Sequence, residues 1–479
     1  VNVASGGKLH ITGENVTLDG LTFASGGTLT ASSIVSTANS GESILGFDSL
    51  VIDKKATDAD KFNAEVAGKL TLGTTTYSGG AAGDKSFNKI TAQSLAVGST
   101  SAFNVGTITL TSINEKSTET DKATAGTITG DLDLKATGSA LKIKGGKYNS
   151  SANVTLTSGN LSVEANGTNT SELTLTGNVV FNTAASTNGS LIASGTSAAD
   201  VDRVVLDASD ATLSYNDNGS NAQGNATINV DYATLKLNGD NLSELFERTT
   251  TSGAIATVDN GGKLVVSGDL ELNANQISGS GLTGAKSGIN LTSGTLSVAD
   301  TLIVNNVAAA TGFSLGNNTA ANAIVKANTL QTVMADKAHA SLLKSGTFVV
   351  TNGLVTDSTK GFEVNDKATL QLGDFKKVSD TVFTSETTNG AINSALTLNH
   401  TDATLNVAAG DWTANSLTVT SGTLTVGQAD SGAKFDAKGD ALKSSLTVDN
   451  LKVSDSTKAV NVTKQGTLNT KEITVDSGS

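Results

Sequence analysis

One short phrase recurs along the chain. An alternating apolar and polar run is followed by Ser or Asn with one or two glycines, and then by a second alternating run. A repeated phrase specifies a repeated piece of structure, so it constrains the fold more than composition does. The seven copies are VASGGKLHI at 3–11, FASGGTLTA at 23–31, LTSGNLSV at 156–163, VDNGGKLVV at 258–266, LTSGTLSV at 291–298, LKSGTFVV at 343–350 and VTSGTLTV at 419–426.

The alternation within a copy predicts β-strands. In VTLTSGNLSV, Leu156, Leu161 and Val163 fall on one face, and Thr155 and Ser162 fall on the other. The glycine permits positive φ at the corner, and the neighbouring Ser or Asn can bond back to the backbone. The intervals between equivalent leucines are 20 residues from Leu9 to Leu29, 19 from Leu405 to Leu424, and 22 from there to Leu446 and again to Leu468.

A coil of about 20 residues cannot bury its own apolar face, so coils of this kind stack and pair edge to edge. We therefore predict an all-β fold, a β-solenoid like a parallel β-helix, with degenerate rungs of ~20 residues and one or two short helical insertions. The absence of proline from all 479 residues suits this fold, because every backbone N–H stays available to a strand ladder. Strands separated by turns also fit tandem β-sandwich domains, which stay open as the alternative.

Two segments break the strand pattern with helical spacing. In NLSELFER, 241–248, an Asn start signal precedes Leu242, Leu245 and Phe246, so we predict a short amphipathic helix. We also predict a helical insertion within 321–343, because apolar residues recur there near one helical stripe. That stripe consists of Ile324, Leu330, Val333, Met334, Ala338 and Leu342.

The segment 184–225 is dominated by Ser, Asn, Gly, Ala and Asp, a composition typical of a long surface loop or domain junction. It separates regions with the strand pattern. The predicted organisation is an N-terminal β-solenoid region at 1–183, a polar loop or junction at 184–225, a central β region with the short helix at 226–320, the helical insertion at 321–343 and a C-terminal β-solenoid region at 344–479.

Charge and composition exclude several classes of function. The net charge is −13, and the basic residues include only two arginines, so nucleic-acid binding is disfavoured. No cysteine is present, which rules out disulfides, thiolate metal sites and cysteine nucleophiles. No apolar run of about 18 residues occurs, so we expect no transmembrane segment. The chain opens with the strand-like VNVASGGKLHITG, and we expect it to be cut from a longer precursor.

Residues with catalytic potential are few and scattered. His10, His339 and His400 lie far apart in the sequence, and no HExxH, GxSxG or GxxxxGK[ST] motif occurs. We therefore predict no catalytic residue, no cofactor-binding residue and no enzymatic activity. Solenoid folds do host polysaccharide-cleaving enzymes that need only two carboxylates. The acids considered for that role, Asp58 with Asp60 and Asp207 with Asp210, lie in polar stretches where solvation explains them.

A metal site is not assigned by the sequence. Acidic repeat proteins often bind calcium through oxygen-rich turns, and Asn216, Asp217 and Asn218 have that composition. They lack the full alternating ligand set of a calcium loop, so a plain Asn-Gly turn is favoured and calcium has no motif to support it. The single tryptophan, Trp412, is interpreted as a packed residue of a rung or corner rather than a platform for sugar stacking.

At the phrases SGGKL, SGGTL and SGTLTV the chain resembles the passenger domains of bacterial autotransporter and haemagglutinin-type adhesins, and equally some proline-poor bacterial surface-layer proteins. The resemblance covers most of the chain outside the predicted helical insertion. It implies export across a Gram-negative envelope, display on the cell surface, and roles in adhesion, aggregation, biofilm or coat assembly.

These observations together lead us to expect a non-enzymatic, extracellular or cell-surface structural protein. It would act in adhesion, self-association, biofilm matrix or surface-layer and filament assembly through strand edges and polar faces. The expected partners are copies of itself, in a homo-oligomer, filament or lattice, together with surface glycans. The alternative function is that of a carbohydrate-binding or carbohydrate-cleaving solenoid spike, which a reducing-sugar assay would distinguish.

Overall fold

A computed structural model of the chain describes the backbone of strands β1 to β12, with the side chains of Ile128 and Leu134, and most residues from Ala140 onward. From there it leaves out the side chains of 182, 215–216 and 247. It also leaves out 157–158, 183–188, 217–225, 248–254, 279–286, 309–311, 314–322, 380, 388, 429–432, 455–459 and 477–479.

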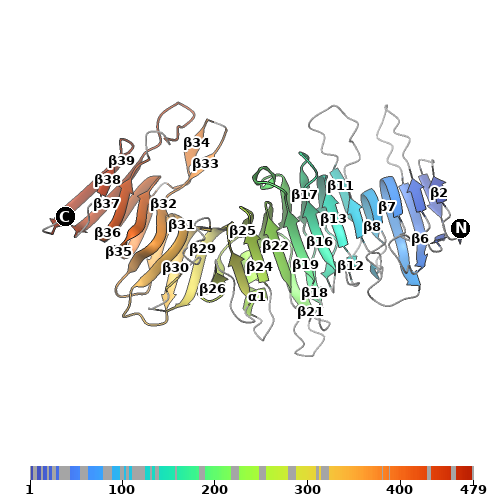
Figure 1. The fold of residues 1–479 in the computed structure, drawn as a ribbon, viewed down its shortest axis with the longest axis horizontal. Helices are drawn as coiled ribbons and strands as arrows, with labels where there is room; N and C mark the ends of the chain where they lie inside the picture. The colour runs from blue at the N-terminus through green and yellow to red at the C-terminus, as the bar shows by residue number, and fades with distance from the viewer. Residues whose placement is uncertain are drawn as a thin grey trace. The chain divides into compact units, whose positions relative to one another are not determined.

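The described chain is nearly all β, and its strands pair in parallel with strands of later coils (Figure 1). This arrangement is a β-solenoid and confirms the predicted fold class. A β-sandwich requires antiparallel sheets packed face to face, so the alternative of tandem sandwiches is wrong. The chain forms two compact units, Val1–Thr257 with Ala285–Ser287, and Val258–Gly284 with Gly288–Ser479. Strand β24 (Ile255–Asp259) contains the boundary.

The strands of unit 1 stack in three columns, and the long strands β6, β7 and β8 each serve more than one column. The first column is β2 (Lys8–Ile11), β5 (Thr28–Ala31), β7 (Asn63–Ser78), β8 (Lys89–Val97), β10 (Thr107–Leu110), β13 (Ala140–Lys144), β16 (Asn160–Glu164), β19 (Ser190–Ser194) and β22 (Thr227–Asp231). The second column shares β7 and β8 with the first and otherwise consists of β3 (Asn15–Leu18), β6 (Ile44–Asp53), β11 (Ala125–Thr129), β14 (Gly146–Ser150), β17 (Ser171–Leu175), β20 (Val204–Ala208) and β23 (Thr234–Asn238).

The third column of unit 1 holds shorter strands. Those of its first coils are β1 (Asn2–Val3) and β4 (Leu21–Phe23); β1 pairs with β4, and β4 pairs with β6. A five-stranded parallel sheet comprises β9 (Ala102–Phe103), β12 (Leu132–Leu134), β15 (Val154–Leu156), β18 (Val179–Asn182) and β21 (Leu213–Asn216).

The core lies between the three columns, because alternate residues of each strand point inward. Leu161, Leu173 and Leu191 are completely buried, as the alternation predicts. The coils are not all of one length: Ala140, Asn160, Ser190 and Thr227 are successive register partners, at intervals of 20, 30 and 37 residues. The predicted period near 20 therefore corresponds to the shortest of these coils, and insertions at the corners lengthen the others.

The predicted helix at 241–248 is confirmed as α1 (Gly239–Glu247). It follows β23 and contacts β21, where the next strand of the third column would otherwise lie. Leu242, Leu245 and Phe246 are at most 1% exposed, and the Asn241 amide donates to the Ala211 carbonyl over 2.8 Å. The helix thus covers the apolar end of the five-stranded sheet.

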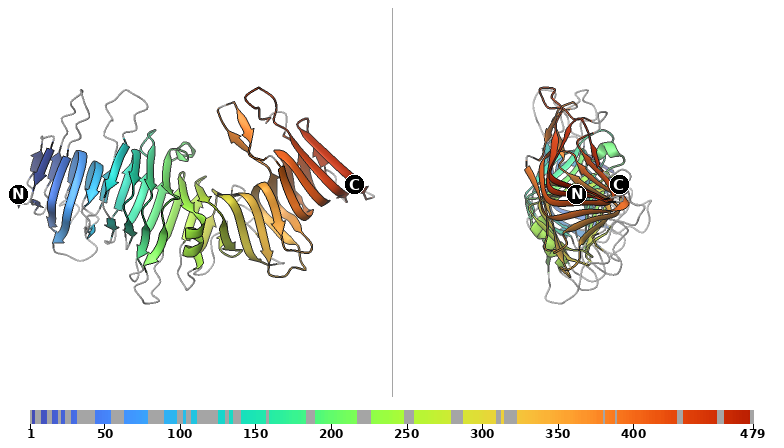
Figure 2. Two further views of the ribbon diagram at one scale, coloured as in Figure 1. Left: turned by 180° about the vertical axis from the view of Figure 1, so that it is seen from behind. Right: turned by 90° about the vertical axis from the view of Figure 1, so that its left-hand side faces the viewer.

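Unit 2 has the same three-column plan but longer strands, which bend at bulges and pass from one column into the next. Its strands are β25 (Lys263–Ser267), β26 (Leu270–Asn273), β27 (Ile277–Ser278), β28 (Gly288–Leu291), β29 (Thr295–Val307), β30 (Ile324–Met334), β31 (Ser341–Thr356), β32 (Phe362–Leu372), β35 (Asn389–Val407), β36 (Gly410–Val426), β37 (Ser444–Val453), β38 (Val460–Val462) and β39 (Gly466–Val475). A small antiparallel hairpin, β33 (Phe375–Lys377) with β34 (Phe383–Ser385), projects from the stacked strands of this unit (Figure 2).

The predicted helical insertion at 321–343 is wrong, because strands β30 and β31 occupy its described part. The inward residues of β30 are Val325, Ala327, Leu330, Thr332 and Met334. At the corner after Ala327 two outward residues, Asn328 and Thr329, follow one another, so one interval between inward residues is three and the others are two. Such intervals imitate helical spacing, although Val333, which the helical stripe included, lies on the outer side.

The predicted polar loop or junction at 184–225 is wrong in its described part as well. Strands β19, β20 and β21 cross this segment, and Leu191, Leu206 and Leu213 are completely buried. Strands β19 and β20 contribute only two and three inward residues, so the corners and outward positions dominate the composition. The segment is therefore a full coil of the solenoid.

The recurring phrases mark corners between strands, and their leucines largely stack as predicted. Leu9 pairs with Leu29, and Leu405 pairs with Leu424. Leu446 does not stack on Leu424, because its partner in the preceding coil is Trp412. At the corner within β36, Gly422 has a φ of 102°, and an added Cβ would lie 2.6 Å from the Ala403 carbonyl oxygen. Glycine is therefore required there.

Candidate functional site

Charged side chains on the outer faces pair between neighbouring coils. Lys147 lies opposite Glu172 in register, with Nζ 3.1 Å from the carboxylate. Lys236 lies opposite Asp207 in the same way, at 2.8 Å. Opposite charges placed directly across a ladder favour one register. Burial opposes ionisation of Asp207, but hydrogen bonds from Lys236 and Ser209 outweigh it and lower the pKa of Asp207.

The outer face of unit 2 also carries a row of hydroxyls. Thr347, Thr369, Thr404 and Thr423 are register partners on four successive coils, and all are half-buried. Neighbouring strands are about 4.8 Å apart, so the row is regular along the stack. A regular row of weak donors and acceptors can contact a partner many times.

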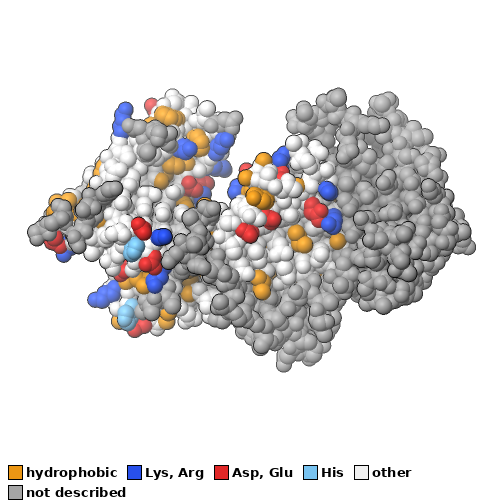
Figure 3. Space-filling model, viewed as in Figure 1, with side chains coloured by type: hydrophobic (Ala, Val, Ile, Leu, Met, Phe, Trp, Pro, Cys, Tyr) orange, Lys and Arg blue, Asp and Glu red, His pale blue; other side chains and the backbone are white. Residues whose placement is uncertain are grey.

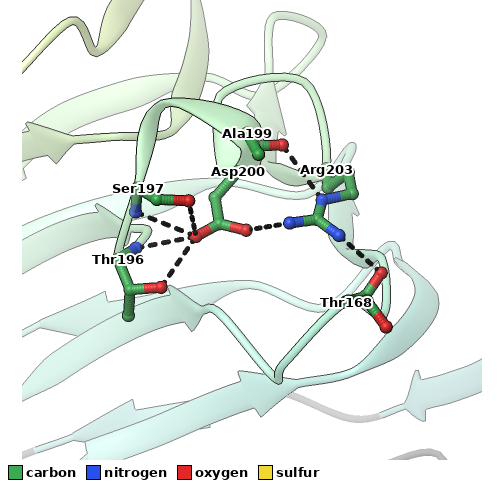
Figure 4. Close-up of polar contacts among 6 residues, drawn as sticks. All are labelled: Thr168, Thr196, Ser197, Ala199, Asp200 and Arg203. Atoms are coloured by element: carbon green, nitrogen blue, oxygen red, sulfur yellow. Dashed lines mark hydrogen bonds and ion pairs between the residues drawn. The ribbon is translucent and has the colours of Figure 1, made fainter.

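A buried carboxylate fastens a corner of unit 1 (Figure 4). Asp200, in the 3₁₀ helix Ala198–Asp200, accepts hydrogen bonds from the backbone N–H and the hydroxyl of Thr196, both at 2.9 Å, and from Ser197. Its other oxygen pairs with the Arg203 guanidinium, which also donates to the Thr168 carbonyl. These bonds, led by that of the Thr196 N–H, lower the pKa of Asp200 to about 2.

The candidate histidines and acids that the structure describes are not brought together. His339 is exposed and lies 3.0 Å from the Asp336 carboxylate in its own turn, and the His400 ring accepts the Asp402 N–H. Asp207 is engaged by Lys236, whereas Asp210 is exposed. Among the described residues, no group of three or more His, Cys, Asp or Glu is placed to hold a metal ion.

The packed position predicted for Trp412 is confirmed. Its side chain is completely buried, and its indole N–H donates to the Ala409 carbonyl over 3.0 Å. It therefore cannot stack on a sugar at the surface. Asn216 ends strand β21, and its side chain is outside the described part of the structure. The side chain of His10 and the residues Asp58, Asp60, Asp217 and Asn218 are also outside it.

Two surfaces were missed by the sequence reasoning, and one is the projecting arm of unit 2. We call "the arm" the segment 375–385, which contains the hairpin β33–β34, together with the turn 433–443. The Phe383 N–H donates to the Phe435 carbonyl over 2.8 Å and joins the two segments. Figure 3 shows hydrophobic and basic side chains side by side over β33 and β34. The signal in the sequence was the pair of lysines followed by Val378, in a stretch without the recurring phrase.

The other surface is the coil formed by β38 and β39. Ile473 and Val475 are 57% and 58% exposed, although their register partners in the preceding coil, Leu451 and Val453, are 2% and 7% exposed. The earlier coils bury these positions because the next coil covers them. The exposed Ile473 and Val475 are thus apolar residues of the kind that a further coil would bury.

No family model, no curated protein and no solved structure matches this chain. The structure itself defines the class of fold, a parallel β-solenoid. Within the described residues, no helix has the length and apolar character required to cross a membrane.

Proposed function

We propose that this chain is a non-enzymatic structural protein of the bacterial cell surface or extracellular space. It acts in adhesion and self-association, as in a biofilm matrix, filament or surface layer, through the flanks and strand edges of its solenoid. Surface glycans are further candidate partners. The extracellular placement rests on the resemblance of the recurring glycine phrases to exported passenger domains.

The observation that carries the proposal is the regular outer face. Thr347, Thr369, Thr404 and Thr423 form one row, and charges such as Lys147 and Glu172 stand on neighbouring coils. Exposed ion pairs contribute only about 0–1 kcal/mol each, so no single contact gives strong binding. Repetition along a stack makes many weak contacts act together, which suits adhesion and assembly.

Sedimentation velocity and negative-stain microscopy test the proposal on the purified chain. We expect larger species that grow with protein concentration and dissolve as salt is raised above physiological ionic strength, because interleaved charges are then screened. A chain that stays monomeric throughout would contradict the proposal. So would release of reducing ends from a polysaccharide panel that Asp207→Asn abolishes, since that result identifies an enzyme.

A further inference from the structure

The arm concentrates exposed apolar surface on one feature of unit 2. Val378 is 62% exposed and Phe435 is 44% exposed. Apart from the coil of β38 and β39, the described residues of unit 2 hold no other large hydrophobic side chain that is this exposed. Exposed apolar groups that gather at one place on a polar exterior mark an interaction site.

The arm is held in a defined position at its base. The Lys326 ammonium lies 2.6 Å from the Asp374 carboxylate and also pairs with Glu386, the residues that flank the hairpin β33–β34. Burial alone would lower the pKa of Lys326, but these two carboxylates outweigh it and raise it. The turn 433–443 is fastened by Gln428, which accepts the Lys434 N–H and donates to the Leu442 carbonyl.

The two segments of the arm also contact each other through their side chains. The Lys434 ammonium lies 4.5 Å from the centre of the Phe383 ring, a cation–π contact that joins the turn to the hairpin. Together with the Phe383–Phe435 backbone bond, this contact makes one surface from two segments that precede β35 and β37 and lie two coils apart. A preformed surface loses little conformational entropy when it binds.

The charge of the arm opposes that of the rest of the chain. The two segments contain five lysines and three aspartates, a net charge of +2 in a chain whose total is −13, which leaves −15 for the remainder. An apolar patch surrounded by lysines is complementary to a partner that is acidic. Two arms facing each other would place lysines against lysines, which disfavours a symmetric arm-to-arm contact.

We propose that the arm docks onto the flank of a second copy of this chain, because the chain outside the arm carries a net charge of −15. This inference rests on the proposed self-association and names the surface responsible for its lateral part. Val378 and Phe435 bury against the neighbouring flank, while Lys376 and Lys438 face its carboxylates. The contact is small compared with a stable interface of about 800 Å² per partner, so it is weak singly and effective when repeated.

The test compares two double charge reversals by sedimentation velocity across a range of concentration and salt. Lys376→Glu with Lys377→Glu alters the arm, and Lys360→Glu with Lys367→Glu is the matched control, because both control lysines are exposed on unit 2 outside the arm. We expect the arm variant to weaken self-association by about tenfold or more and to flatten its salt dependence, and the control to associate as the wild type does. Phe435→Ser, which keeps the charge, should weaken association as well.

The outcomes separate this inference from the proposed function. Self-association that is equal in the wild type, the arm variant and Phe435→Ser overturns the role of the arm and leaves the proposed function standing. A wild type that never self-associates overturns both. A monomeric wild type that binds anionic vesicles or an acidic polysaccharide through Lys376 and Lys377 assigns the arm to another partner and equally contradicts docking to a second copy.

Discussion

Asp200 illustrates how a carboxylate in this chain can look like a catalytic group and be structural. It is buried, its pKa is lowered, and a guanidinium lies beside it, which are also features of active sites. Its partners, however, are the backbone and hydroxyls of its own turn and Arg203, three residues later. The group therefore fixes the corner between β19 and β20.

Asp200→Asn should lower the free energy of unfolding by about 1–3 kcal/mol. The amide cannot accept all the bonds that the carboxylate accepts, and it leaves the Arg203 charge without its partner. Urea denaturation followed by circular dichroism measures the change. Asp210→Asn is the control, because Asp210 is exposed in the turn after β20, and it should shift the midpoint very little. Equal effects of the two substitutions would contradict the structural role of Asp200.

The same carboxylate predicts how stability changes with pH. Because the folded-state pKa of Asp200, about 2, is below the ordinary value of 3.8, its contribution is complete above pH ~4 and is lost as the pH falls through about 2. The contribution is on the order of 2 kcal/mol at neutral pH. Measured from pH 7 to pH 2, the difference in stability between the wild type and Asp200→Asn should shrink at the acid end. A difference that stays constant would count against this pKa.

Tyr148 is the opposite case, a polar group that the core does not satisfy. Its side chain is 1% exposed, its hydroxyl has no hydrogen-bond partner among the described residues, and burial raises its pKa far above the ordinary value. Tyr148→Phe should leave the free energy of unfolding unchanged or raise it by up to about 2 kcal/mol, because an unsatisfied hydroxyl is removed. Thermal and urea unfolding check this. A loss of more than about 1 kcal/mol would reveal a hydrogen bond that stabilises the folded state.

Strand β30 shows how a bend hides a strand from periodicity. The strand turns a corner between Ala327 and Thr329 and keeps its inward alternation on both sides. The two successive outward residues at the corner introduce one interval of three, and the period of two itself places Leu330 and Met334 four residues apart, as on a helix. The longer strands of unit 2 bend in this way at several register shifts.

Two alanine substitutions in β30 distinguish a strand from a helix. Leu330→Ala should cost about 2–5 kcal/mol because Leu330 is buried, whereas Val333→Ala should cost less than about 1 kcal/mol because Val333 faces outward. On a helical stripe the two residues would share the buried face and the costs would be similar. Urea midpoints of the two variants, compared with the wild type, decide between these arrangements.

Within each unit, every coil is stabilised mainly by the coils on either side of it. Columns such as Leu296, Val325, Phe348, Leu370 and Leu405 place apolar residues in contact from one coil to the next. Stability of this kind is approximately a sum of nearest-neighbour terms, and folding propagates from coil to coil. The hydrogen-bonded ladders between coils use the backbone N–H groups, and because the chain contains no proline, every residue can donate one.

Refolding should therefore show no phase limited by proline isomerisation. Trp412 is the single tryptophan and is buried in unit 2, so its fluorescence follows the folding of that unit. Adding a prolyl isomerase should leave every refolding rate unchanged, even if long-range parallel pairing makes refolding slow. Acceleration by the isomerase would contradict this expectation.

The sequence by itself determined the strands of the recurring phrases, the parallel solenoid, the helix α1 and the packed position of Trp412. These follow from the side-chain period and the turn residues, which are local properties of the chain. Only the tertiary structure decided that β30 bends, that 184–225 is a coil, and that 375–385 meets 433–443 in the arm. Local periodicity records which side of a strand faces inward, but the partner of a distant segment depends on which coil lies next to it. The lengths of the intervening corners set that neighbour, and no pattern within either segment encodes it.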